Sequence, residues 1–195
     1  MASAEFWYEF ASSYSYPAAL RIGALADARG VSLVWRPFLL GPIFAAQGWR
    51  DSPFNIYPAK GRYMWRDLER TCKVMGVPLK RPEPFPQPSL LAARIALVLE
   101  GDERSDFSRR VFVAEFGHGL PIADRATLGA LLDACGVDPT MTFECAESES
   151  NKARLKAECA RAWRRRACRF FTPGLCRRIR SRLADRRSCD APRLA

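Results

Sequence analysis

Near the N-terminus, the hydrophobic pattern predicts two short strands with a helix between them. Residues 5–10 (EFWYEF) and 31–38 (VSLVWRPF) are short apolar runs rich in aromatic and β-branched residues, which is typical of strands. Residues 17–26 have helical spacing, with Pro17 near the first turn and Gly30 beyond the end. Strand, helix and strand in this order predict a right-handed βαβ unit of a parallel sheet.

The remaining pattern predicts one long loop and then mostly helices. Residues 39–59 are rich in glycine and proline and predict an irregular loop, and structureless loops of about 20 residues in compact domains are often functional. Helical spacing resumes at residues 61–74, and the five prolines of residues 78–88 predict a rigid connector. Four further helices are expected at 89–99, 104–116, 124–135 and 139–166, with Ser89 and Asp124 as N-caps.

Composition places the chain among ordinary soluble proteins and excludes several classes. Of 195 residues, 48% are hydrophobic and 27% charged, and no apolar run reaches the roughly 18 residues of a membrane span. The N-terminus lacks the pattern of a signal peptide, so we expect a cytoplasmic protein. The seven cysteines include no C-x-x-C pair, so we expect neither a redox dithiol nor a metal site.

The positive charge is concentrated at the C-terminal end. The chain has a net charge of +10, which suggests an acidic partner, but residues 157–195 contain 12 arginines, no lysine and three acids. From totals of 31 basic and 21 acidic residues, this leaves 19 and 18 for the first 156 residues. A nucleic-acid-binding protein that uses these arginines on phosphates is therefore an alternative of another class. The nearly neutral body and the lack of a nucleic-acid-binding motif argue against it.

The turn after the first strand carries the candidate chemistry. Residues 9–16 (EFASSYSY) lie between a predicted strand and a predicted helix, where backbone N–H groups and the helix dipole stabilise an anion. A serine hydroxyl there can donate a charge-assisted hydrogen bond, and a thiolate is a suitable acceptor. Taken alone, serines at this position are usually only helix caps, and capping is the favoured interpretation. With no G-x-S-x-G motif and only one histidine, the exposed-turn residue His118, Ser12 is not expected to be a hydrolase nucleophile.

Several separated motifs resemble one enzyme family. Residues 9–16 resemble the F-x-S-P-x-S-Y motif of the kappa-class glutathione transferases and the related 2-hydroxychromene-2-carboxylate isomerases, with Ser13 in place of the usual proline. Residues 36–44 (RPFLLGPIF), 47–49, 52–55 and 58–64 resemble the isomerase branch in order and spacing. The resemblance implies an α/β thioredoxin-like fold with an inserted all-helical subdomain. Residues 1–80 would form the βαβ part with the active-site loop, and residues 81–156 the inserted subdomain.

The resemblance also implies a cofactor, a reaction and site residues. Ser12 falls on the serine that these enzymes place against the glutathione sulfur, and Lys60 and Trp49 would contact glutathione while Asn55 contacts the substrate. Without the family, the favoured interpretation is structural, with Trp49 as a packing residue and Lys60 as a solvated charge. The implied enzyme is a homodimeric, glutathione-dependent cis–trans isomerase, in which the thiolate adds to the substrate, a single bond rotates, and elimination follows. A kappa-type transferase is the alternative. A DsbA-like oxidoreductase is rejected, because serines replace both cysteines of the redox pair.

The C-terminal segment, residues 157–195, departs from the family pattern. The family continues with a G-x-P-[ST]-F segment that contains a cis-proline and with a W-G-x-D-R-L segment that binds the γ-glutamyl end of glutathione, and neither occurs here. We hypothesise that the chain is read out of frame from about Glu158, with loss of the last strands and helix of the thioredoxin-like domain. Sequencing the gene tests this, because an intact frame with no G-x-P-[ST] codons in any frame would contradict it.

Overall fold

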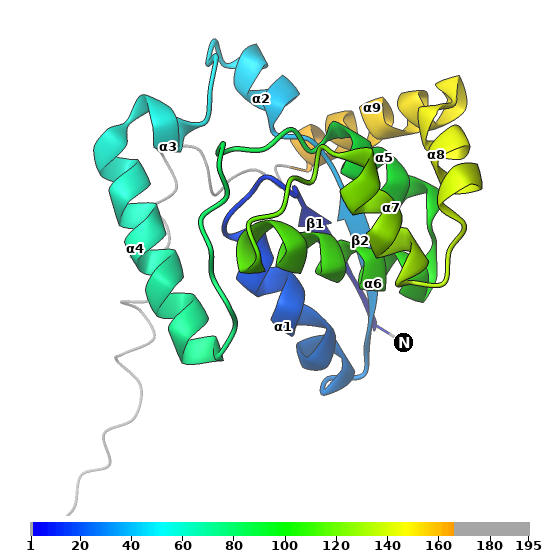
Figure 1. Ribbon diagram of the computed structural model, residues 1–195, viewed down its shortest axis with the longest axis horizontal. Coiled ribbons are helices and arrows are strands. Elements are labelled where there is room, and N and C mark those ends of the chain that lie inside the picture. Colours follow the sequence, from blue (N-terminus) through cyan, green and yellow to red (C-terminus); the bar gives the residue numbers. More distant parts are fainter. Residues whose placement is uncertain (1, 166–195) are drawn as a thin grey trace, which may run out of the picture.

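A computed structural model describes residues 2–165 and contains the predicted βαβ unit (Figure 1). Strand β1 (Ala2–Tyr8) pairs in parallel with β2 (Val31–Pro37), in a register that runs from Ala2 opposite Val31 to Tyr8 opposite Pro37. Helix α1 (Ser15–Asp27) connects them. Gly30 adopts φ 59°, a left-handed conformation that glycine tolerates best, and so allows the chain to enter β2 directly after the helix.

The prediction of an irregular loop over residues 39–59 is wrong, because this segment contains two short helices. These are α2 (Gly41–Ala46) and α3 (Pro53–Ile56), and α4 (Pro58–Met75) follows immediately. Each of the three helices has a proline in its first turn, where the missing N–H has no helical partner to lose. In Figure 1, α3 and α4 lie on one side of the molecule, and the proline-rich connector runs between α4 and the other helices.

The second half of the described chain is helical, as predicted, with one additional break. Helix α5 (Leu90–Val98) is followed by α6 (Gly101–Phe112), a π-helical turn η1 (Val113–Gly117), α7 (Arg125–Asp133), α8 (Pro139–Glu147) and α9 (Glu149–Arg164). The single helix expected at 139–166 is split at Ser148, which is extended (ψ 148°) and caps α9 through the N–H of Asn151. None of the helices within residues 2–165 is long and apolar enough to cross a membrane.

One face of the two-stranded sheet forms an aromatic core against α6. Phe6, Tyr8 and Trp35 alternate onto this face, and the Tyr8 ring lies 5.9 Å from that of Phe112. The Tyr8 side chain is fully buried, and its hydroxyl forms a 2.7 Å hydrogen bond with the Ser108 hydroxyl of α6. This contact fixes the end of β1, from which the turn toward α1 departs.

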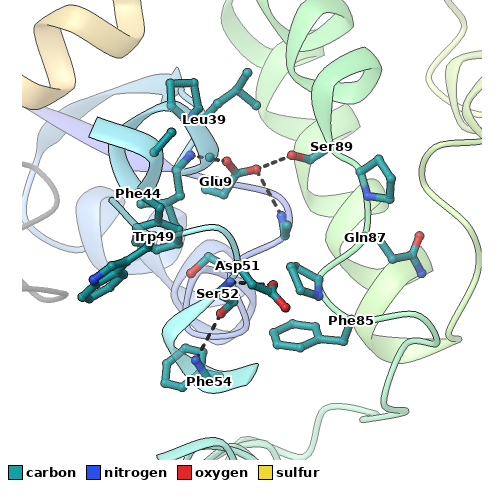
Figure 2. Close-up of a pocket in the computed structure, with 18 of the residues that line it drawn as sticks. Glu9, Leu39, Phe44, Trp49, Asp51, Ser52, Phe54, Phe85, Gln87 and Ser89 are labelled. Carbon is teal, nitrogen blue, oxygen red and sulfur yellow. Dashed lines mark hydrogen bonds between the residues drawn. The ribbon is translucent and has the colours of Figure 1, made fainter. Parts of the chain in front are cut away.

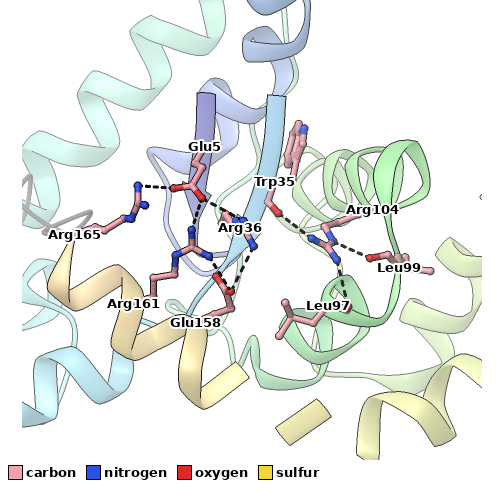
Figure 3. Close-up of polar contacts among 9 residues, drawn as sticks. All are labelled: Glu5, Trp35, Arg36, Leu97, Leu99, Arg104, Glu158, Arg161 and Arg165. Atoms are coloured by element: carbon pink, nitrogen blue, oxygen red, sulfur yellow. Dashed lines mark hydrogen bonds and ion pairs between the residues drawn. The ribbon is translucent and has the colours of Figure 1, made fainter. Parts of the chain in front are cut away.

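The opposite face of the sheet is tied to α9 by ion pairs (Figure 3). Glu5 of β1 accepts a hydrogen bond from Arg161 at 2.8 Å and forms an ion pair with Arg165 at 2.9 Å. Arg36 of β2 lies 3.2 Å from Glu5 and 3.5 Å from Glu158. Helix α9 therefore continues, packed on the sheet, through the boundary that we predicted between residues 156 and 157. The rest of the divergent segment, and with it the predicted loss of C-terminal strands, lies outside the described residues.

Candidate functional site

A cavity of about 610 Å³ opens beside the turn that follows β1 (Figure 2). Its walls come from three separate segments, namely residues 9–13, the α2–α3 region at residues 39–54, and residues 85–90 of the connector and the start of α5. Most lining side chains are apolar, with a few polar groups among them, and the volume is in the range of small-molecule sites.

Ser12 lies in this cavity in the position that the sequence predicted. Its backbone N–H donates to the Glu9 carbonyl (3.1 Å), and its carbonyl accepts from the N–H of Ser15 (3.0 Å), so the turn places Ser12 just before α1. The side chain is 8% exposed, and its hydroxyl has no hydrogen-bond partner among the described residues. The neighbouring hydroxyl of Ser13 is buried and likewise unpaired within residues 2–165. Ser12 can therefore offer its proton to a ligand atom in the cavity.

Glu9 is a residue of the site that our sequence analysis did not identify. The residue is 3% exposed, and its carboxylate forms hydrogen bonds to all three segments that line the cavity. One oxygen accepts from the Ser89 hydroxyl (2.5 Å) and the Ala11 N–H (3.2 Å), and the other accepts from the Leu40 N–H (2.7 Å), as Figure 2 shows. Burial raises the pKa of Glu9, while these hydrogen bonds oppose the rise.

The Ser89 interaction explains one departure from the predicted helix caps. Asp124 caps α7 as expected, by accepting from the N–H of Thr127, but Ser89 makes no side-chain cap at α5. Its hydroxyl donates to Glu9 instead. A signal for Glu9 was present in the sequence, because an acid between the aromatic residues Tyr8 and Phe10 at a strand end is costly to bury without several donors.

A second buried carboxyl, Glu115, lies near Glu9 but outside the cavity lining. It belongs to the π-helical turn η1, a conformation that is frequent at functional sites. The residue has no exposed surface, and neither carboxyl oxygen has a partner among the described residues. Burial, with the charge of Glu9 as the smaller cause, holds the pKa of Glu115 well above its ordinary value. Glu115 therefore holds its proton to a higher pH in the folded protein than in the unfolded chain.

Of the loop residues predicted for the site, Trp49 lines the cavity. Its ring centroid lies 5.6 Å from that of Phe44, and its backbone N–H donates to the Phe44 carbonyl at 2.9 Å. Trp49 thus packs on α2 and is also one of the residues that line the cavity (Figure 2). Ser12 and Trp49 thus line the same cavity, and their contacts with glutathione stay predictions.

Asn55 and Lys60 do not line this cavity. The Asn55 amide is exposed and donates to the Asp51 carboxylate (3.1 Å) and the Phe85 carbonyl (3.0 Å), which ties α3 to the connector. Lys60 is exposed at the start of α4, with its Nζ 4.4 Å from the centroid of the Tyr57 ring. Their roles in substrate and glutathione binding stay predictions. Arg50 is the cation of the cavity lining, and it forms no ion pair with a described residue.

The described cysteines do not contribute a thiol to the cavity. Cys72, Cys135, Cys145 and Cys159 are free, and burial raises the pKa of Cys72 and of Cys159. Within residues 2–165, no cluster of three or more His, Cys, Asp or Glu residues could hold a metal ion. Among the residues described for the cavity lining, the side chains therefore include the hydroxyl of Ser12 but no thiol.

Comparisons with known proteins agree on the fold. The chain is similar in structure to a 2-hydroxychromene-2-carboxylate isomerase, with a TM-score of 0.75, 21% identity, and coverage of 84% of this chain and 80% of that one. A protein assigned as a disulfide isomerase from Nitrosomonas europaea gives a TM-score of 0.62 at 16% identity, with coverage of 82% and 78%. A protein assigned as a DsbA oxidoreductase from Streptomyces coelicolor also gives 0.62, at 17% identity, with coverage of 84% and 76%. No curated protein sequence is significantly similar to the chain.

The family profile covers most of the chain. It matches residues 4–168, which include the βαβ unit, the cavity and the helical region, and it extends past Glu158, where we expected the departure to begin. The mixed α/β architecture with a helical insertion, predicted from the motifs, is consistent with this match. The chain belongs to the family of DsbA-like thioredoxin domains.

Proposed function

We propose that this protein is a glutathione-dependent cis–trans isomerase that acts on 2-hydroxychromene-2-carboxylate or a related intermediate of aromatic degradation. The observation that carries the proposal is the unpaired Ser12 hydroxyl at the start of α1, in a cavity large enough for a thiol cofactor and an aromatic substrate. The fold shared with a 2-hydroxychromene-2-carboxylate isomerase supports the same reading.

The residues of the cavity fit glutathione as a ligand. Ser12 offers a donor to sulfur, the first turn of α1 offers the positive end of its dipole, and Arg50 offers a charge to a carboxylate. Such surroundings favour the ionised form of a thiol whose ordinary pKa is about 8.5. When bound, glutathione would supply a nucleophilic sulfur that adds reversibly to a conjugated double bond.

The remaining residues have roles that do not need redox chemistry. The Ser12 hydroxyl holds its hydrogen bond to the sulfur and loses no proton in the reaction. Trp49, Phe85 and Phe44 form apolar walls that can hold a flat aromatic body and exclude water from it. Glu9 positions the walls by binding Ala11, Leu40 and Ser89, and so keeps the turn that carries Ser12 in register with them.

Isomerase turnover tests the proposal. The purified chain should convert 2-hydroxychromene-2-carboxylate to the trans-benzylidenepyruvate only when glutathione is present, as followed by ultraviolet absorbance. Ser12→Ala should lower kcat roughly tenfold or more, since it removes a charge-assisted hydrogen bond, whereas Ser13→Ala, which removes the adjacent hydroxyl, should change it little. Equal turnover of the wild type and Ser12→Ala would refute the assignment of Ser12.

The same assay separates isomerisation from the kappa-type transferase alternative. An isomerase restores glutathione in each cycle, so free thiol, measured with a thiol reagent, stays constant while the substrate is converted. A transferase consumes one thiol for each product molecule. Stoichiometric loss of thiol would therefore replace the proposed isomerase with a transferase that uses the same cavity.

A further inference from the structure

A second hollow, here called the α9 groove, adjoins the Ser12 cavity. It has a volume of about 380 Å³ and lies between α2, α5 and α9. Leu39, Pro42 and Leu90 line both spaces and so form a wall between them. Ser12 and Glu9 are not part of the groove, and its volume is sufficient for one small ligand.

The charged residues that line the α9 groove are all cations. Arg94 comes from α5, and Lys152 and Lys156 from α9. Lys152 is engaged by Glu149 at 2.7 Å, but Arg94 and Lys156 form no ion pair with any described residue. The Nε atom of Arg94 is buried and has no partner within residues 2–165. Two cationic side chains are therefore available to an anion, and one of them holds a buried donor that is costly to leave unpaired.

The floor of the α9 groove is apolar. Ile43 and Leu155 are buried beneath it, and the indole of Trp163, half exposed, forms one rim. A bare phosphate ion has no apolar surface to bury against Ile43 and Leu155. A neutral apolar molecule has no charge to pair with Arg94 and Lys156. The combination matches a ligand with a flat or aliphatic apolar body and a single anionic group.

We propose that the α9 groove is a second ligand site, which binds an amphipathic organic carboxylate. The carboxylate would lie between Lys156 and Arg94, and the apolar body would cover Leu155 and the wall shared with the Ser12 cavity. This site is distinct from the one invoked for the proposed isomerase function, because neither Ser12 nor Glu9 lines it and the two spaces share only the wall of Leu39, Pro42 and Leu90. It places an organic acid directly behind the wall of the candidate active site.

Calorimetry with 2-naphthoate and with its neutral analogue 2-naphthamide tests the charge requirement. The wild-type chain should bind naphthoate roughly tenfold more tightly than naphthamide, because only the carboxylate forms charge-assisted hydrogen bonds with Lys156 and Arg94. Lys156→Gln should weaken naphthoate binding by a similar factor. Arg154→Gln is the matched control, since it removes the same charge from the same helix at a residue that lines a different hollow.

A second pair of variants locates the ligand. Ala160 and Ala157 are both exposed on α9, but only Ala160 lines the α9 groove. Ala160→Trp should therefore abolish naphthoate binding, and Ala157→Trp should leave it intact. Ser12→Ala should also leave it intact, which keeps this test separate from that of the isomerase. The proposal is overturned if naphthamide binds as tightly as naphthoate, if Lys156→Gln behaves like Arg154→Gln, or if binding survives in Ala160→Trp.

Discussion

The raised pKa of Glu115, a buried acid near Glu9, can be tested through the pH dependence of the free energy of unfolding. Its folded-state pKa is raised, first by burial and then by Glu9, so the native state holds a proton that the unfolded chain releases above about pH 4.5. Between the unfolded and folded pKa values, the native state binds more protons than the unfolded state. The free energy of unfolding therefore falls as pH rises through this window, by up to about 1.4 kcal/mol per pH unit for one group.

The substitution Glu115→Gln removes this titration and keeps the size of the side chain. Urea unfolding from about pH 5 to about pH 8 should show a free energy that declines with pH in the wild type and declines less steeply in the variant. The gap between the two curves should widen with pH in favour of the glutamine. Glu144→Gln, at an exposed position of α8, is the control and should follow the wild type. Parallel curves for wild type and Glu115→Gln would refute the raised pKa of Glu115 in the folded protein.

Two further substitutions test how the cavity walls and α9 are held. A Cβ at Gly61 would collide with the backbone carbonyl of Phe54, so Gly61→Ala should destabilise the protein by about 2 kcal/mol or more. Gly41→Ala is the control, since nothing lies near its Cβ, and it should change the free energy of unfolding by less than about 0.5 kcal/mol. Equal urea midpoints for the two variants would contradict this. Arg161→Ala removes a 2.8 Å ion pair with the partly buried Glu5 and should cost about 1 kcal/mol at low salt and less at high salt. A cost that does not change with salt would show that packing, rather than charge, holds α9 there.

Local signals in the sequence were sufficient for the elements that define the fold. The βαβ unit followed from two apolar runs and the helix between them, because each element is specified by its own residues. The helices α2 and α3 were missed because prolines usually end helices, whereas Pro42 and Pro53 occupy first turns. The break between α8 and α9 was missed because the sequence on both sides of Ser148 has helical spacing.

The candidate site was only partly predictable, for a different physical reason. Ser12 was identified because its motif is short and contiguous. The partnership of Glu9 and Ser89 joins residues far apart in the chain, and no local pattern reports such a contact. Asn55 and Lys60 lie on a segment whose helices turn them toward the connector and the solvent, and that direction depends on packing that residue type alone does not specify.

In the proposed function, the cavity binds glutathione as a thiolate that accepts a hydrogen bond from Ser12. Calorimetry of glutathione binding, repeated in buffers of different ionisation enthalpy, measures the affinity and the protons released together. The wild type should show saturable binding with proton release, and Ser12→Ala should show an affinity roughly tenfold lower with much of the proton release lost. Equal affinity and equal proton release in the two proteins, or no binding by a folded wild-type chain, would contradict it.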